Sequence, residues 1–198
     1  MNIGELTTLQ HEMVALWHQQ QPENTYEGFL ALVCEQHMRN YLLWHQEDIA
    51  RSPDVTDKEV ATVKRNIDRL NQERNDHIEK LDAAIIEMLA DSGVEPIEGA
   101  TLNTETPGSV IDRLSIMSLR MYHMEEQMAR RDATEEHRSK AKERLVRCIE
   151  QHRDLSNGLE ELLMDLFDGR KFLKVYHQFK MYNDPTMNPY LYASKKAA

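Results

Sequence analysis

The stretch that decides the fold is TDKEVATVKRNIDRLNQERNDHIEKLDAAIIEMLAD, residues 56–91. It opens with Thr56-Asp-Lys-Glu59, a capping box in which the Thr hydroxyl and the Glu carboxylate each accept a hydrogen bond from an orphan backbone N–H. Apolar residues then recur in alternating steps of three and four as far as Met88, which is the spacing of one helix face. The pattern predicts one long helix from residue 57 to about Asp91, ended by Gly93.

The rest of the chain shares this preference for helix. Among 198 residues there are only seven Gly and six Pro, which leaves few helix breakers. We expect an all-α fold, an antiparallel bundle of five to six helices in a single domain spanning residues 1–198, with the helix that starts at Pro107 in its centre. A loop at 93–105 and a C-terminal tail at 184–198, docking or flexible, complete it. Cap and breaker signals place the other helices at about residues 5–20, 25–51, 107–131, 133–168 and 170–182.

Charge is unevenly spread along the chain. The net charge is −10, but residues 169–198 hold six Lys or Arg against one Asp, which leaves −15 on residues 1–168. An acidic body argues against a nucleic-acid partner. The basic end either holds an anion or complements a helix dipole, and both alternatives stay open.

Cysteine spacing and hydropathy indicate where the protein works. Cys34 and Cys148 lie far apart with no CxxC spacing, which is typical of reduced, packed thiols. The longest apolar run, 29–34, is far shorter than a membrane span, and the N-terminus has no signal-peptide core. We therefore expect a cytoplasmic protein with no membrane association.

A first candidate site follows from Arg74, which interrupts the apolar face of the long helix. A buried charge is costly unless an opposite charge pairs with it, and Asp48 on the preceding helix is the expected partner. The polar residues in question are His45, Asp48, Arg51, Asp68, Asn71, Arg74, Asn75 and Asp76. They form either a buried network that sets helix register or a site in which His45 is a general acid or base oriented by a carboxylate.

A second candidate lies where Thr104-Glu-Thr-Pro-Gly-Ser109 begins a helix and Arg113 follows one turn later. Free N–H groups at a helix start, the Ser109 hydroxyl and an arginine suit a phosphate or carboxylate. Lys174 from the basic end is expected to complete such an anion pocket. The alternative is that this sequence is only a helix cap.

Three segments carry a family resemblance: 43–51 with 67–76, then Thr106–Ser115, then Gln178–Pro185. Together they resemble the bacterial family called domain of unknown function 4254. The resemblance implies a helical cytosolic protein with no assigned activity. It also implies that the gene lies near genes for glycosyltransferases of surface-polysaccharide assembly. A phosphorylated sugar is therefore one candidate ligand.

Metal and cofactor chemistry have little support in the spacing of residues. Nine His are present, but the Glu-x-x-His repeats of di-iron bundles are absent. His11 and His18, like His37 and His45, are too far apart in sequence to indicate a shared ion. The chain also lacks the common nucleotide, hydrolase and redox motifs. We expect no dedicated metal site and no cofactor.

These observations lead to three functional hypotheses. The first is a protein that binds an anionic small molecule through Ser109, Arg113, Arg74, Arg51 and Lys174. The second is a small-molecule enzyme in which His45 with Asp48, or Asp112, supplies acid–base chemistry. The third is a protein-interaction scaffold, with a homodimer formed through the tyrosine-rich tail.

Overall fold

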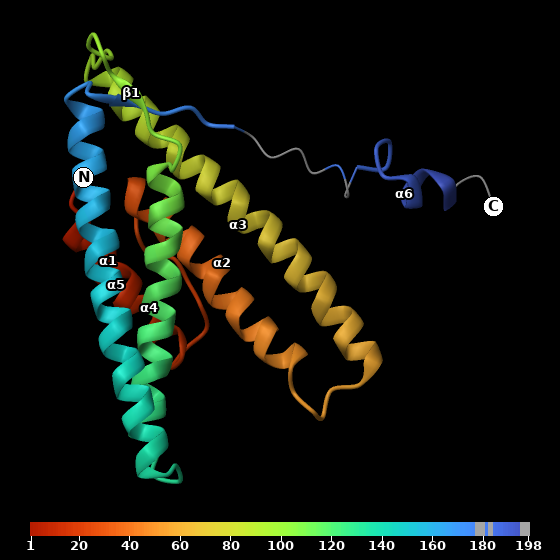
Figure 1. The fold of residues 1–198 in the computed structure, drawn as a ribbon. Helices are drawn as coiled ribbons and strands as arrows, with labels where there is room; N and C mark the ends of the chain where they lie inside the picture. The colour runs from red at the N-terminus through yellow and green to blue at the C-terminus, as the bar shows by residue number, and fades with distance from the viewer. Residues whose placement is uncertain (177–180, 182–183, 195–198) are drawn as a thin grey trace.

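In the computed structural model, which describes residues 1–176, 181 and 184–194, long helices account for most of the chain (Figure 1). The expected all-α fold is confirmed. Two strands of two residues each, β1 (Thr101–Leu102) and β2 (Lys171–Phe172), and the short helix α6 (Pro189–Ser194) add little to it. The long helices are α1 (Ile3–Trp17), α2 (Gly28–Ala50), α3 (Asp57–Asp91), α4 (Pro107–Ala129) and α5 (Glu135–Phe167).

Local capping sets several of the helix ends. The capping box is present at the start of α3, where the Thr56 N–H donates to Glu59 Oε2 at 2.9 Å. The side chain of Thr134 accepts from the His137 N–H at 3.2 Å at the start of α5. Gly93, with φ of 66°, follows the end of α3 in a conformation that favours glycine.

The helices form two antiparallel hairpins, α2 with α3 and α4 with α5, which cross at an angle (Figure 1). α4 packs against α1, α2, α3 and α5 and carries more buried positions than any other described helix. The prediction of a central helix beginning at Pro107 is therefore confirmed. Fully buried leucines and isoleucines of the core include Leu6, Leu81, Ile85, Ile111, Leu114 and Leu159.

The predicted helix at 170–182 is wrong for residues 170–176. Gly169 turns the chain with φ of 69°, and Lys171–Phe172 then pairs in parallel with Thr101–Leu102. The Ile97 N–H donates to the Gly169 carbonyl at 3.0 Å, so the loop at 93–105 is tied to this segment. Tertiary pairing has overridden the helical preference of the basic residues. Residues 177–180 and 182–183 lie outside the described part.

The C-terminal tail is exposed where the structure describes it. Tyr190 is 89% exposed, and α6 lies apart from the long helices in Figure 1. A docking role for the tail, including a homodimer contact, stays a prediction. None of the helices in the described part of the chain combines the length and apolar character that crossing a bilayer requires.

Gly108 permits the close approach of α4 to α3, which gives a test of the packing. A Cβ at this position would lie 2.6 Å from the Ile78 carbonyl oxygen and 2.8 Å from Asp82 Oδ1. We expect Gly108→Ala to lower the free energy of unfolding by about 1–3 kcal/mol in urea titrations, because α4 must move away from α3. Gly158→Ala is the control, since a Cβ there meets no atom within 4 Å. Equal stability of Gly108→Ala and wild type would contradict this packing.

Candidate functional site

One carboxylate, that of Asp112 on α4, joins three helices. Its Oδ1 accepts from Arg74 Nε on α3 at 2.7 Å, and its Oδ2 accepts from Arg74 Nη2. The same Oδ1 accepts from Gln36 Nε2 at 2.6 Å and from Asn40 Nδ2 at 2.9 Å, both on α2. Asp112 is only 3% exposed, so these donors replace the water that it loses.

The prediction that Asp48 pairs with Arg74 is wrong, although Arg74 does have a carboxylate partner. Asp48 lies near the end of α2 and lines a cavity of about 310 Å³ together with Arg51 and Arg74. Arg51 is exposed and pairs with Glu47 on its own helix. The predicted residues Asp48, Arg51 and Arg74 therefore share a cavity, but the buried pair is made with a residue from another helix.

A buried histidine extends the Asp112 network. His37 Nδ1 lies 2.7 Å from Ser115 Oγ, which also accepts from Asn40 Nδ2 at 2.9 Å. Complete burial lowers the pKa of His37 to about 3, so the ring is neutral at physiological pH. The network contains one ion pair and neutral partners around it, which favours a role in setting helix register.

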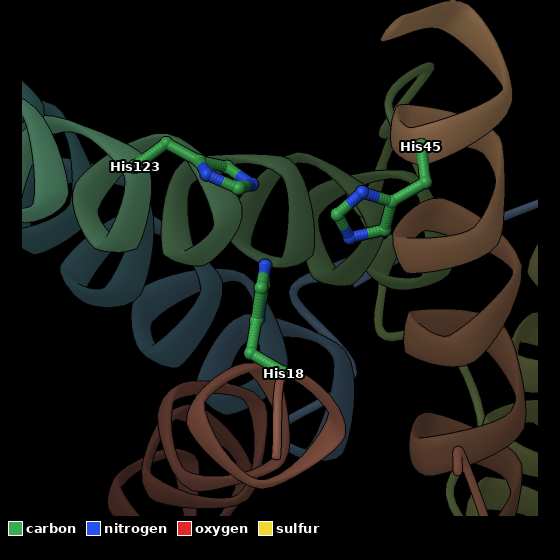
Figure 2. A group of neighbouring side chains, drawn as sticks. All are labelled: His18, His45 and His123. Carbon is green, nitrogen blue, oxygen red and sulfur yellow. The ribbon is translucent and has the colours of Figure 1, made fainter. Parts of the chain in front are cut away.

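His45 takes no part in that network and faces two other histidines. His18 follows the end of α1, His45 lies on α2 and His123 lies on α4. One ring nitrogen from each lies within 4.8 Å of the other two. Figure 2 shows the three rings directed toward a common space. We refer to these residues as the three-histidine cluster.

The hydrogen bonds of His18 and His123 use Nδ1 and leave Nε2 without a partner. Nε2 of all three rings is buried without a hydrogen-bond partner. His18 Nδ1 lies 2.7 Å from the Val14 carbonyl oxygen, which only accepts, so this nitrogen carries the proton. His123 Nδ1 lies 2.6 Å from Glu126 Oε2 and donates in the same way. In neutral rings, Nε2 of His18 and of His123 is then an unprotonated acceptor.

Burial favours the neutral form of the third ring, that of His45. It lowers the pKa of His45, and the positive charges that His18 and His123 carry when protonated lower it further. Neutral imidazole is the form that ligates metals. Burial therefore favours the metal-binding form of His45.

Aromatic side chains hold the rings in place. Tyr122 stacks on His18 with ring centroids 4.2 Å apart, and Trp44 stacks on His123 at 4.8 Å. Tyr41 packs edge-on against His45 at 4.5 Å, and its hydroxyl donates to the Trp17 carbonyl oxygen at 2.7 Å. Restricted rotation of a ligand ring reduces the entropy lost when an ion binds.

Sequence spacing gave no signal for this cluster. The expectation of no metal site considered pairs of histidines close together in the chain, whereas 27 residues separate His18 from His45 and 78 separate His45 from His123. Only the packing of α1, α2 and α4 brings them together. The one available sign was that His45 lies on the apolar face of its helix, where an unpaired ring nitrogen is costly.

The start of α4, expected to hold an anion, uses its donors internally. The Gly108 N–H donates to Asp82 Oδ1 at 2.6 Å, and the Ser109 N–H donates to Thr106 Oγ1 at 3.3 Å. Asp82 is buried and supplies the negative charge that a helix N-terminus favours. At this position the structure shows a helix cap.

The other residues predicted for an anion pocket are divided. Arg113 pairs with Glu105 at 2.6 Å and lines a cleft of about 720 Å³ between α4 and α5. Lys171 of β2 lines the same cleft, whereas Lys174 is exposed and does not. The basic end therefore contributes Lys171, a strand residue, to the cleft that Arg113 lines. The predicted contributor was Lys174, on a helix.

Comparison with protein families places the chain. A model of the family described as protein of unknown function (DUF4254) matches residues 30–175. The chain belongs to the DUF4254 family. No curated protein and no solved structure matches it. The DUF4254 match contains His45, His123, Arg74 and Asp112, while His18 precedes it.

The Asp112 network of this DUF4254 protein is testable by a double-mutant cycle. Asp112→Leu leaves the Arg74 guanidinium without its carboxylate, so we expect the free energy of unfolding to fall by about 3–5 kcal/mol. Arg74→Met combined with Asp112→Leu removes both charges, and this double variant should be more stable than Asp112→Leu alone. Urea unfolding measures both effects. A loss below about 1 kcal/mol for Asp112→Leu would contradict the structural role of the pair.

Proposed function

We propose that this DUF4254 protein binds a divalent transition-metal ion, Zn²⁺ above all, through His18, His45 and His123. Two observations carry the proposal: one ring nitrogen from each histidine lies within 4.8 Å of the other two, and Nε2 of each ring is buried without a hydrogen-bond partner. Each buried acceptor left unpaired costs about 1–3 kcal/mol. An ion bound between the rings would remove that cost for all three.

The dimensions of the cluster are close to those of a bound ion. Zn–N bonds of about 2.0–2.1 Å in tetrahedral geometry put ligand nitrogens about 3.3 Å apart. The ligand nitrogens of the cluster lie within 4.8 Å of one another. Shifts of about an ångström, within the reach of small side-chain rotations, therefore bring the rings to bonding distance.

The donor set selects the class of ion. Among the described residues, the group contains imidazoles and neither a thiolate nor a carboxylate. Imidazole nitrogen suits Zn²⁺, Cu²⁺ and Ni²⁺, whereas Mg²⁺ and Ca²⁺ require oxygen ligands. Glu126 and the Val14 carbonyl are outer partners of the kind that orient metal-bound histidines.

Three protein ligands leave one tetrahedral position for water or a substrate, as in catalytic zinc sites. In this proposal His45 is a metal ligand, and the acid–base role considered for it with Asp48 is replaced by activation of a bound water.

Three further proposals are separate from metal binding: a cytoplasmic location, a role as an interaction scaffold, and the binding of a phosphorylated sugar of surface-glycan assembly. The last of these rests on the family resemblance.

Metal binding is measured by competition with a chromogenic chelator after the protein has been stripped of metal. We expect one Zn²⁺ per chain. Asn in place of His18, His45 or His123 should weaken binding by about a hundredfold or more. Replacing a residue that only hydrogen-bonds to a metal ligand already lowers metal affinity by about 10–100-fold, and loss of the ligand itself costs more. His77→Asn is the matched control, since His77 Nδ1 also lies 2.7 Å from a backbone carbonyl, that of Glu73. A variant with all three histidines replaced by Asn should bind no Zn²⁺. If it still bound one Zn²⁺ per chain, the proposal would be overturned.

The same titration has a predicted pH dependence. Protons compete with the ion for the ring nitrogens, so affinity should fall by more than about tenfold from pH 7 to pH 5. The lowered pKa of His45 means that this ring resists protonation to a lower pH than a free imidazole does. Affinity that does not change over this range would indicate ligands other than histidine.

A further inference from the structure

The cleft between α4 and α5 is separate from the three-histidine cluster. Its volume is about 720 Å³, and none of the three histidines lines it. Its walls carry three cations, Arg113 and Arg120 from α4 and Lys171 from β2, against two carboxylates, Glu105 and Asp154. With Asp165, which pairs with Lys171, the charges around the cleft balance, in contrast to the net charge of −15 on residues 1–168.

The cations have a defined spacing. Arg113 and Arg120 are seven residues apart, so they lie on one face of α4, about 10 Å apart along the helix axis. Lys171 is held by the pairing of β2 with β1, the strand that leads toward the start of α4. Arg113 therefore lies nearer the start of α4, the end toward which β1 leads from its pairing with the strand of Lys171, and Arg120 lies further along the helix.

The existing partners of these cations are exchangeable. Arg113 pairs with Glu105, and both side chains are about half exposed. Lys171 Nζ lies 3.1 Å from Asp165 Oδ2. The exposed pair of Arg113 with Glu105 contributes about 0–1 kcal/mol, so a ligand can replace it at little cost. Among the ion pairs of the described residues, Arg120 takes part in none.

Gly158 gives an independent sign of a ligand. It lies inside α5, where glycine costs about 1 kcal/mol relative to alanine. Its φ is not positive, and an added Cβ would meet no atom within 4 Å. Neither backbone conformation nor packing within the described residues requires glycine here, in contrast to Gly108. Gly158 lines the cleft, so its missing side chain keeps that wall open.

We propose that this cleft binds an elongated organic anion with a negative group at each end. One end lies on Arg120 and the other on Arg113 with Lys171. The body of the ligand runs along the wall that Gly158 leaves open, beside Val110 and Leu155. The site is independent of the metal centre.

A series of α,ω-dicarboxylates of increasing chain length probes the spacing directly, with binding followed by calorimetry. Affinity should be highest when the carboxylates are about 10 Å apart, and the monocarboxylate of the same length should bind at least tenfold more weakly. Arg120→Gln should reduce the affinity of the best dianion about tenfold or more. Gly158→Leu should abolish binding by filling the cleft, with a urea-unfolding midpoint no lower than that of wild type.

Two controls separate this site from the rest of the molecule. Arg138→Gln removes a partly exposed arginine that pairs with Glu135 outside the cleft and should leave dianion binding unchanged. His45→Asn should weaken metal binding by about a hundredfold or more and leave dianion binding intact. No binding by any dianion, or binding indifferent to Arg120 and Gly158, would overturn the proposal.

Discussion

The buried carboxylate of Asp112 is the constraint on which the arrangement of α2, α3 and α4 depends. A charge in this position must be paired, because an uncompensated buried charge costs more than most single packing contacts contribute. Arg74 from α3 and the amides of Gln36 and Asn40 from α2 satisfy it together. Sliding any one helix by a turn would break these bonds, so the network specifies the relative register of all three.

The three-histidine cluster follows from that register. His45 lies five residues after Asn40, and His123 lies eleven residues after Asp112. α2 and α4 run in the same general direction (Figure 1), so both histidines lie beyond the level at which the Asp112 network joins the two helices. His18 is brought in by α1, which Gln10 ties to α4 through a bond from Nε2 to the Ile111 carbonyl at 3.1 Å. An ion in the cluster would in turn stabilise the docking of α1, because it binds only the folded chain.

Local physics made much of the fold predictable. The long helix at 57–91 was recognisable because each of its signals is local. The capping box, the spacing of the apolar face and the glycine at 93 each involve residues only a few positions apart. The need of Arg74 for a carboxylate was also predictable, since it follows from burial alone. Its partner was not, because Asp112 lies 38 residues further on and the spacing of one helix does not say which neighbour it meets.

The incorrect and missing sequence predictions share a physical cause. Residues 170–176 have a local preference for helix, but strand pairing with Thr101–Leu102 decides their conformation. Ser109 has the sequence of an anion site, yet Thr106 and Asp82, from within the chain, already occupy the donors at that helix start. The histidine cluster and the position of Gly158 on the cleft arise only when separate helices pack. Each of these features depends on tertiary contacts that no local pattern records.

X-ray absorption at the zinc edge, on protein loaded with one equivalent of Zn²⁺, tests the metal centre most directly. We predict three imidazole nitrogens and one further light atom at about 2.0–2.1 Å. The His18→Asn protein should lose one imidazole from that shell. A shell containing sulfur, six oxygen ligands, or a spectrum unchanged in the His18→Asn protein would contradict a metal centre built by these three histidines.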